Sequence, residues 1–421
     1  MASSSGDQLE PAQMVDAGIP PPEPALTPHE MLLRAEAMRP ILRERQAICE
    51  EIGRLPEETN QEFLGAGFYR MLQPRRLGGY EFDLRDFIRV MTEVSRGCPE
   101  SGWVLALTAG HAAAFLPRFE PLTQFEVCGA TGDFRGPGVA RPMGVAIPVP
   151  GGYSVKGAWD FCSGCDIATH FLGCVMIMDP ESKAPRAFGF VLCDRKDFSI
   201  VDNWDVIGMQ GTGSDRVVIE NLILPPHRVL EGSDAKPPVR FAAPDRTLFN
   251  NPLYHGPWLC LLLCELISVA VGAARGALDI YEQDLRDRKM PFPPFLPRYE
   301  TPDYQHLFGH LQGLIDTAEA ASLELGSIYM ESSRRAQDGA DASPEEERRF
   351  IRIGQQCMDF AWEGVDTMFH SSGTSSARKT SPLGRYFKNL AVIRTHTFSQ
   401  THHASTNAAR LHFGLPAMGL V

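Results

Sequence analysis

The sequence predicts an α+β protein built from a helical domain, a central β-domain and a C-terminal four-helix bundle, in that order. Three observations predict it: helical periodicity in the first part, short β-rich segments separated by Gly and Pro in the middle, and long amphipathic segments after about residue 250. The chain has 421 residues, 43% of them hydrophobic, which is enough to bury a large core. We expect a disordered leader at 1–25 and domains at 26–132, 133–240 and 250–421.

The first helix is expected to begin after the leader, which is rich in Ser, Pro and acidic residues. Thr27 and Glu30 have the spacing of a capping box, and Pro28 between them suits the first helical position. Helical periodicity then continues, with Pro40 interrupting or kinking the helix. Further helical segments reach about residue 126, broken at the turn LGGY, and complete the first domain.

The middle of the chain has the pattern of an all-β domain. Between residues 136 and 228, runs of four to eight strand-forming residues alternate with Gly and Pro. Strands at this spacing indicate a compact antiparallel sandwich or barrel.

The last part of the chain has the pattern of a helical bundle. Four long amphipathic segments are expected at about 258–286, 303–337, 343–369 and 383–411. The most apolar stretch, from Trp258 to Leu278, contains Glu265 and Arg275 and therefore suits a buried bundle helix better than a membrane span. The polar stretch 370–384 is long for a simple connection, and we expect it to contact a ligand.

Charge and cysteine usage exclude several classes of function. A net charge of −12 disfavours binding to nucleic acid or to an anionic membrane, so small molecules or proteins are the expected partners. The N-terminus lacks a signal-peptide pattern, and ten scattered cysteines suit reduced thiols in the cytoplasm. Cys162 and Cys165 have CxxC spacing, but no second such pair exists, so we interpret them as small buried side chains and expect no metal site.

Two motifs carry a family resemblance. The run LPEETNQEFLGAGFYRMLQPRRLGGYEFD is similar to the opening motif of the acyl-CoA dehydrogenase-like flavoproteins, and WDVIGMQGTGSDRVVIENLILPPHRV is similar to the hallmark of their β-domain. The resemblance extends from about residue 30 to 416 and implies the fold of that superfamily.

Acyl-CoA oxidation requires a carboxylate base, and the sequence departs from the dehydrogenases at that position. In the commonest version the base is a Glu near the last helix, where this chain has Thr397. A dehydrogenase-type flavoprotein that uses Glu265 as its base remains the alternative. The loop that precedes the β-domain in dehydrogenases is replaced by RGPGVARPMGVA.

The closer resemblance is to the oxygenase components of two-component flavin monooxygenases, such as those that hydroxylate 4-hydroxyphenylacetate and secosteroid phenols. The stretch GGYSVKGAWDFCSGCD matches their pattern. The resemblance implies hydroxylation of a phenol-like aromatic substrate with O2 through a flavin C4a-hydroperoxide. It also implies FADH2 or FMNH2 supplied by a separate NAD(P)H:flavin reductase, and a homotetramer. N- or S-oxygenation by the same chemistry stays open.

The resemblance also implies site residues. The expected catalytic residues are Ser163 beside flavin N5, His111 near the substrate, and His396 as base or proton donor. The remaining flavin-binding residues are expected to be Trp159, Phe161, Thr212, Gly213, Ser214, Ser375, Ser376, Arg378 and Arg385. The substrate pocket is expected to include Trp103, Gly138, Val139 and Ala140 besides the two histidines. Lys388 and Asn389 replace a usual Arg-Asp pair, which leaves the choice between FAD and FMN open.

Overall fold

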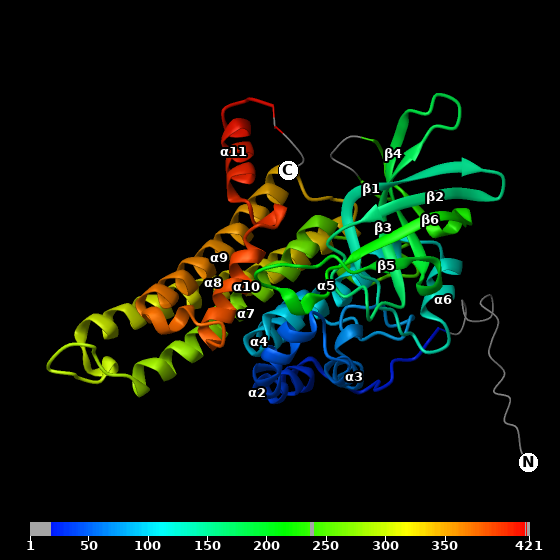
Figure 1. The fold of residues 1–421 in the computed structure, drawn as a ribbon. Helices are drawn as coiled ribbons and strands as arrows, with labels where there is room; N and C mark the ends of the chain where they lie inside the picture. Colours follow the sequence, from blue (N-terminus) through cyan, green and yellow to red (C-terminus); the bar gives the residue numbers. More distant parts are fainter. Residues whose placement is uncertain (1–17, 236–239, 417, 419–421) are drawn as a thin grey trace, which may run out of the picture.

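The computed structural model describes residues 18–235, 240–416 and 418. In Figure 1 the N-terminal helices lie beside the base of a β-sheet, and three long helices of the C-terminal part extend away from both. Helices occur between residues 28 and 128, strands between 138 and 231, and helices again between 258 and 412. The chain therefore follows the predicted order of helices, sheet and helices.

The N-terminal part contains helices α2 (Pro28–Ile52), α3 (Glu57–Ala66), α4 (Leu84–Gly97), α5 (Pro99–Phe115) and α6 (Pro121–Cys128). The predicted capping box is confirmed, because Thr27 and Glu30 bond reciprocally to each other's backbone N–H groups. The predicted disorder was wrong for the end of the leader. Ile19 is buried and its N–H donates to the carbonyl of Arg76, because its apolar side chain gains more from packing than the chain loses in entropy. Residues 1–17 lie outside the described part.

The β-domain forms one seven-stranded sheet. Its strands are β1 (Gly138–Val149), β2 (Gly152–Trp159), β3 (His170–Met178), β4 (Pro185–Asp194), β5 (Ser199–Val201), β6 (Arg216–Leu224) and β7 (Val229–Glu231), in the spatial order β5-β6-β2-β1-β3-β4-β7. The expectation of purely antiparallel pairing was wrong for β1 and β3, which pair in parallel. The reason is that β1 and β2 form a hairpin, after which the chain crosses to the far side of β1. This crossover, residues 160–169, contains the motif FCSGC.

The C-terminal part contains the long helices α7 (Trp258–Asp287), α8 (Pro302–Gln337) and α9 (Pro344–Ser371), followed by α10 (Pro382–Ile393) and α11 (Thr401–His412). The single last helix expected at 383–411 was wrong, because the chain leaves the helix after Ile393 and resumes it at Thr401. In Figure 1, α11 projects from the end of the long helices, where it contacts α9. The break places His396 in a turn rather than on a helix.

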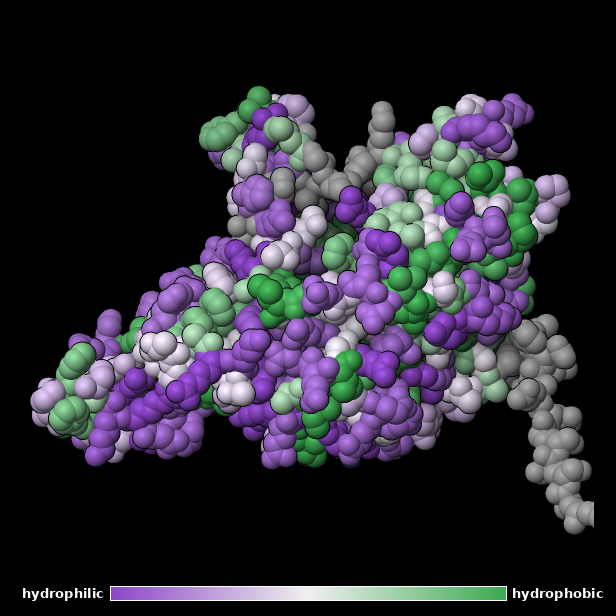
Figure 2. Space-filling model, viewed as in Figure 1, coloured by the Kyte–Doolittle hydropathy of each residue, from purple (hydrophilic) through white to green (hydrophobic). Residues whose placement is uncertain are grey.

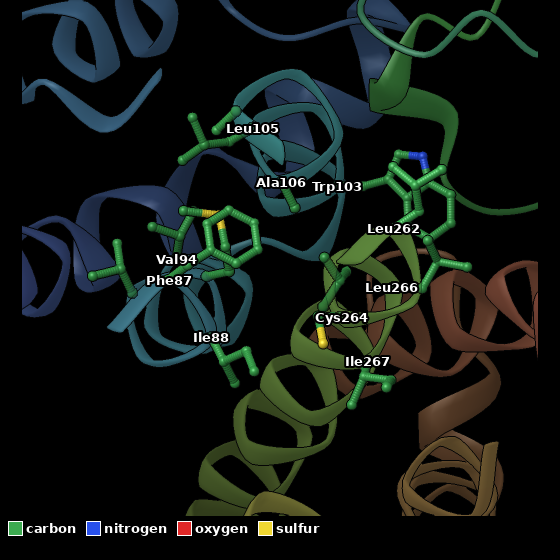
Figure 3. Packing of buried hydrophobic residues seen from close by; sticks show 14 of the residues in the cluster. Phe87, Ile88, Val94, Trp103, Leu105, Ala106, Leu262, Cys264, Leu266 and Ile267 are labelled. Atoms are coloured by element: carbon green, nitrogen blue, oxygen red, sulfur yellow. The ribbon is translucent and has the colours of Figure 1, made fainter. Parts of the chain in front are cut away.

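Helix α7 forms the core of the bundle. By length and composition it could cross a membrane, but 89% of its most apolar window is buried inside the protein. It packs against α4, α5, α8 and α9, and Figure 3 shows side chains of α4, α5 and α7 in one apolar cluster. Burial explains the apolar sequence of this helix, as predicted. It also makes Glu265, which is 1% exposed, an exceptional residue.

The outer surface of the β-domain carries several exposed hydrophobic side chains. Phe161, Val201, Ile207 and Ile223 are between 45% and 74% exposed. On the face shown in Figure 2, hydrophobic side chains gather over the β-domain, whereas the bundle is mostly hydrophilic. An exposed apolar surface of this kind suits contact with a ligand or another chain.

Candidate functional site

The crossover after β2 meets the turn 209–214 and the start of α5. Gly164 N–H donates to the carbonyl of Thr212 (2.9 Å), and Cys162 N–H donates to that of Asp215 (3.2 Å). Phe161 has a φ of 68° and its side chain is 63% exposed. A phenylalanine in the left-handed region costs roughly 1–3 kcal/mol, and such strain is concentrated at functional sites. The crossover is therefore held in a specific shape that presents Phe161 outward and Ser163 inward.

Four side chains form a hydrogen-bond chain behind Phe161. Trp103 Nε1 donates to Ser163 Oγ (3.0 Å), Ser163 Oγ lies 2.7 Å from Ser214 Oγ, and Ser214 Oγ lies 2.6 Å from Thr212 Oγ1. Thr212 Oγ1 also donates to the carbonyl of Met209 (2.8 Å).

The direction of this chain follows from its two ends, because an indole N–H can only donate and a carbonyl can only accept. The Thr212 proton is used on Met209, so Ser214 donates to Thr212 and Ser163 donates to Ser214. Ser163 Oγ therefore accepts from Trp103 and keeps one lone pair unused.

The turn 209–214 is anchored on its other side by two polar residues. Gly211 N–H donates to Glu100 Oε1 (3.0 Å), and Met209 N–H donates to Asn389 Oδ1 (2.7 Å). Gly213 has a φ of 50°, a left-handed conformation that glycine adopts without strain. Glu100 and Asn389 thus hold the backbone that positions Thr212 and Ser214. Glu100 was not found from the sequence, and Asn389 was noted there only as a departure from an Arg-Asp pair, because both act on backbone groups that are distant along the chain.

Burial raises the pKa of Glu100 to about 8, and the nearby Cys98 acts in the same direction. The unfolded state ionises Glu100 near pH 4.5, so its contribution to stability is complete below that pH and is lost as the pH rises to about 8. We expect the free energy of unfolding to fall between pH 6.5 and 8 by up to about 1.4 kcal/mol per pH unit from this group. Urea unfolding at several pH values should show a shallower fall for Glu100→Gln, and an unchanged slope would contradict the shift.

Trp159 and the two cysteines lie inside the β-domain. Trp159 is fully buried and its Nε1 donates to the carbonyl of Cys174 (2.8 Å). Trp159 therefore has no exposed surface that could contact a cofactor, and the proposed flavin site does not include it. Cys162 and Cys165 are fully buried beside it, and burial raises the pKa of both thiols, that of Cys165 to about 12. This placement agrees with their interpretation as core side chains.

His111 on α5 is buried, and its tautomer follows from its partner. Nδ1 lies 3.0 Å from the carbonyl oxygen of Gly136, so Nδ1 carries the proton and Nε2 is an acceptor. Burial lowers the pKa of His111 to about 4, so the ring is neutral at physiological pH. Its Cε1 approaches Gly138 so closely that a side chain there would lie 3.3 Å away.

The pocket residues at the start of β1 face in two directions, as the pleat of a strand requires. Gly138 is partly buried on the side of His111, whereas Val139 packs into the β-domain core with Trp159. Ala140 is exposed. The structure therefore brings Gly138, but not the side chain of Val139, next to His111.

His396 lies in the break between α10 and α11. Its Nδ1 accepts from Phe398 N–H (3.3 Å), which leaves Nε2 as the protonated nitrogen of the neutral ring. The ring packs edge-on against Trp103 with 5.8 Å between centroids. His396 is exposed, yet the surrounding protein atoms lower its pKa. The structure thus connects His396, through Trp103, to Ser163.

The predicted loop residues lie apart from the hydrogen-bond chain that contains Ser163. Ser375 accepts from Arg288, Ser376 donates to the carbonyl of Phe369 (2.9 Å), Arg378 is exposed, and Arg385 Nε donates to Glu50 Oε2 (2.9 Å). In the described part of the chain, none of the four shares a hydrogen bond or ion pair with Ser163, Thr212 or Ser214. Lys388 also pairs with Glu50, while Asn389 binds the turn.

Comparison with known proteins identifies the family. Residues 266–401 match the family described as acyl-CoA dehydrogenase, C-terminal domain. The oxygenase subunit HsaA of a flavin-dependent monooxygenase from Rhodococcus jostii is 30% identical over 385 residues, which cover 91% of this chain and 98% of that protein. The chain belongs to this family of flavin-dependent monooxygenase oxygenase subunits.

Two further relatives agree with this assignment of the oxygenase subunit. The oxygenase component of an FADH2-dependent resorcinol hydroxylase from a Rhizobium species is 28% identical, and the match covers 94% of this chain and 98% of that one. The crystal structure of 3-HSA hydroxylase from Rhodococcus sp. RHA1 has a TM-score of 0.82 and 28% identity, covering 93% of this chain and 98% of that one. The predicted acyl-CoA dehydrogenase-like fold and the predicted monooxygenase class are confirmed.

The residues of the oxygenase subunit fit a reduced flavin. Reduced flavin has an N–H group at N5, and the unused lone pair of Ser163 Oγ is an acceptor of matching polarity. Phe161 offers an exposed aromatic face beside it, and Trp204 packs edge-on against Phe161 with 6.1 Å between centroids. The donor and acceptor pattern, more than the apolar surface, is specific to the reduced form of the cofactor.

Proposed function

We propose that this oxygenase subunit takes FADH2 or FMNH2 from a separate NAD(P)H:flavin reductase and hydroxylates a phenol-like aromatic substrate with O2. In this reaction one oxygen atom enters the substrate and the other leaves as water, while the flavin is oxidised. The observation that carries the proposal is the directed hydrogen-bond chain, which leaves Ser163 Oγ as an acceptor.

Each residue of the hydrogen-bond chain has a distinct role in the proposal. Ser163 holds the proton on flavin N5, and Ser214 and Thr212 keep its hydroxyl turned away from N5. Trp103 is a positioning residue that supplies the N–H group to Ser163. Because Ser163, Ser214 and Thr212 are buried, water is excluded from the proton that must not be lost. Phe161 covers the flavin ring, and Gly213 lets the turn approach it.

The two histidines have different roles in the proposed reaction. His111 binds the substrate and accepts the phenolic proton at Nε2, since its Nδ1–H is already used on Gly136. His396 carries its proton on Nε2 and would therefore donate a hydrogen bond to the oxygen that leaves as water. Phenolate is the more nucleophilic form of the substrate, so an acceptor at His111 favours the reaction.

We also propose that the subunit works as a homotetramer in the cytoplasm. Arg378 and the loop around Ser375 and Ser376 would reach the flavin of a neighbouring subunit, because Arg378 is exposed and none of the three is bonded to the Ser163 chain. Arg385 would hold this loop through Glu50. A net charge of −12 favours neither nucleic acid nor an anionic membrane as a partner. Light scattering with and without reduced flavin tests the assembly.

The function is tested by anaerobic titration with FADH2 and FMNH2, followed by mixing with O2 and a panel of phenols, indoles and amines. We expect reduced flavin to bind more tightly than oxidised flavin, and one phenol class to yield an oxygenated product. Labelling from 18O2 should place one oxygen atom in that product. Absence of reduced-flavin binding, or release of all the oxygen as H2O2 with every aromatic, would overturn the proposal.

A further inference from the structure

Glu265 is a buried carboxyl group to which the proposed reaction assigns no role. It lies on α7, is 1% exposed, and neither of its oxygens has a hydrogen-bond partner among the described residues. An unpartnered buried carboxyl costs free energy, so a group of this kind calls for a ligand or water that is bound in use. Gly110 on α5 makes room for it, since a Cβ there would lie 2.0 Å from Oε1.

The acceptor nitrogen of His111 lies next to this carboxyl. Nε2 of His111 is 3.9 Å from Oε2 of Glu265, which is too long for a direct hydrogen bond. Nε2 is an acceptor because Nδ1–H is used on Gly136. Burial raises the pKa of Glu265 well above its ordinary value, and a protonated carboxyl is a donor. A donor and an acceptor therefore lie side by side without bonding to each other.

The separation of these two groups matches a single oxygen atom that is hydrogen-bonded to both. An oxygen about 2.8 Å from each would span the 3.9 Å separation with an angle of roughly 90° between its two hydrogen bonds. A hydroxyl can accept one hydrogen bond and donate another at the same time. A methoxy oxygen could only accept, and an indole N–H could only donate to His111 while leaving the carboxyl proton unpaired.

We propose that Glu265 and His111 together form a two-point receptor for the phenolic hydroxyl of the substrate, with Glu265 donating to the oxygen and His111 accepting its proton. The inference rests on the proposed function and adds a second residue that recognises the hydroxyl group of the phenol-like substrate. Glu265 is a binding residue in this arrangement, and its neutral form keeps the buried pair free of net charge. Donation from Glu265 also stabilises the negative charge that develops on the oxygen as its proton moves to His111.

The test compares two substitutions of Glu265 with opposite expectations. Glu265→Gln keeps an N–H donor of the same size, whereas Glu265→Leu keeps the volume and removes the donor. The probes are 2-naphthol with 2-methoxynaphthalene and 4-ethylphenol with 4-ethylanisole. Their dissociation constants are measured by calorimetry in the presence of reduced flavin without O2. Thermal melting curves of both variants are recorded to check that they fold.

We expect the wild-type protein and Glu265→Gln to bind each phenol at least about tenfold more tightly than its methyl ether, as one well-formed hydrogen bond provides. Glu265→Leu should bind each phenol about tenfold more weakly than the wild-type protein does, because the donor to the phenolic oxygen is lost, while the remaining hydrogen bond to His111 keeps the preference over the methyl ether. Glu347→Gln and Glu347→Leu are matched controls on α9, where burial also raises the pKa of a carboxyl, and they should keep the wild-type dissociation constants. Infrared difference spectra of wild type minus Glu265→Gln should contain a protonated-carboxyl band at neutral pH.

An unchanged affinity for both phenols in Glu265→Leu would overturn the inference, as would a wild-type protein that binds no phenol probe. An equal loss of phenol affinity in Glu265→Gln would mean that Glu265 acts as an ionised acceptor, which also contradicts it. These failures leave the proposed function intact if the same protein still binds reduced flavin and oxygenates another phenol of the panel. Failure to bind reduced flavin at all would instead remove the proposed function.

Discussion

Replacing Ser163 with alanine is expected to divert the reaction from product to H2O2. The substitution removes the proposed acceptor of the N5 proton and leaves Trp103 Nε1 without its partner in a buried site. A lost hydrogen bond with an unsatisfied buried partner costs about 1–3 kcal/mol, which corresponds to a change of roughly 5- to 150-fold in the ratio of hydroxylation to peroxide release. Product and H2O2 are quantified per reduced flavin consumed, while the affinity for reduced flavin should change less.

Two further substitutions make this expectation specific. Trp103→Phe removes the donor to Ser163 but keeps an aromatic ring and the serine hydroxyl, and it should produce a smaller increase in H2O2. Ser322→Ala removes a buried serine hydroxyl on α8 that bonds to the carbonyl of Glu319 (2.7 Å), and it should leave the product ratio at the wild-type value. An unchanged product ratio in Ser163→Ala would rule out its proposed role.

His111→Asn is expected to lower kcat for a phenol by roughly 10²- to 10⁴-fold, the contribution of a positioned acid or base. The amide nitrogen of asparagine can still donate to the carbonyl of Gly136 in place of Nδ1, but the acceptor Nε2 is lost. The pKa of His111 is lowered to about 4, so the base should be neutral from about pH 5 upward. The wild-type rate should therefore show no ascending limb near pH 6.5.

The complementary variant His111→Gln tests which nitrogen matters. Its side-chain amide reaches the position of Nε2 and abandons the bond to Gly136. If the acceptor at Nε2 is what counts, Gln should retain more activity than Asn, and pre-ionised substrates such as nitrophenolates should reduce the loss in both. Equal rates for His111→Asn and the wild-type protein would move the base to another residue.

Much of the fold was determined by local patterns in the sequence. Thr27 and Glu30 marked the first helix correctly, and the apolar stretch from Trp258 proved to be the buried helix α7. These features rest on interactions between residues close in sequence or on hydrophobic periodicity, which a single chain displays directly. The family resemblance likewise predicted the flavin-dependent monooxygenase class.

Tertiary structure alone decided how the predicted site residues relate to one another. The parallel pairing of β1 and β3, the break that holds His396 and the burial of Trp159 all depend on contacts between distant segments. The hydrogen bond from Trp103 to Ser163 joins residues that are 60 positions apart in the sequence. His111 on α5 and Glu265 on α7 are brought together only by the packing of these two helices. The direction of a hydrogen bond and the charge of a buried carboxyl depend on neighbours and burial. The sequence by itself therefore determined which chemistry the chain carries, whereas only the folded structure decided which atoms are left to meet the cofactor and substrate.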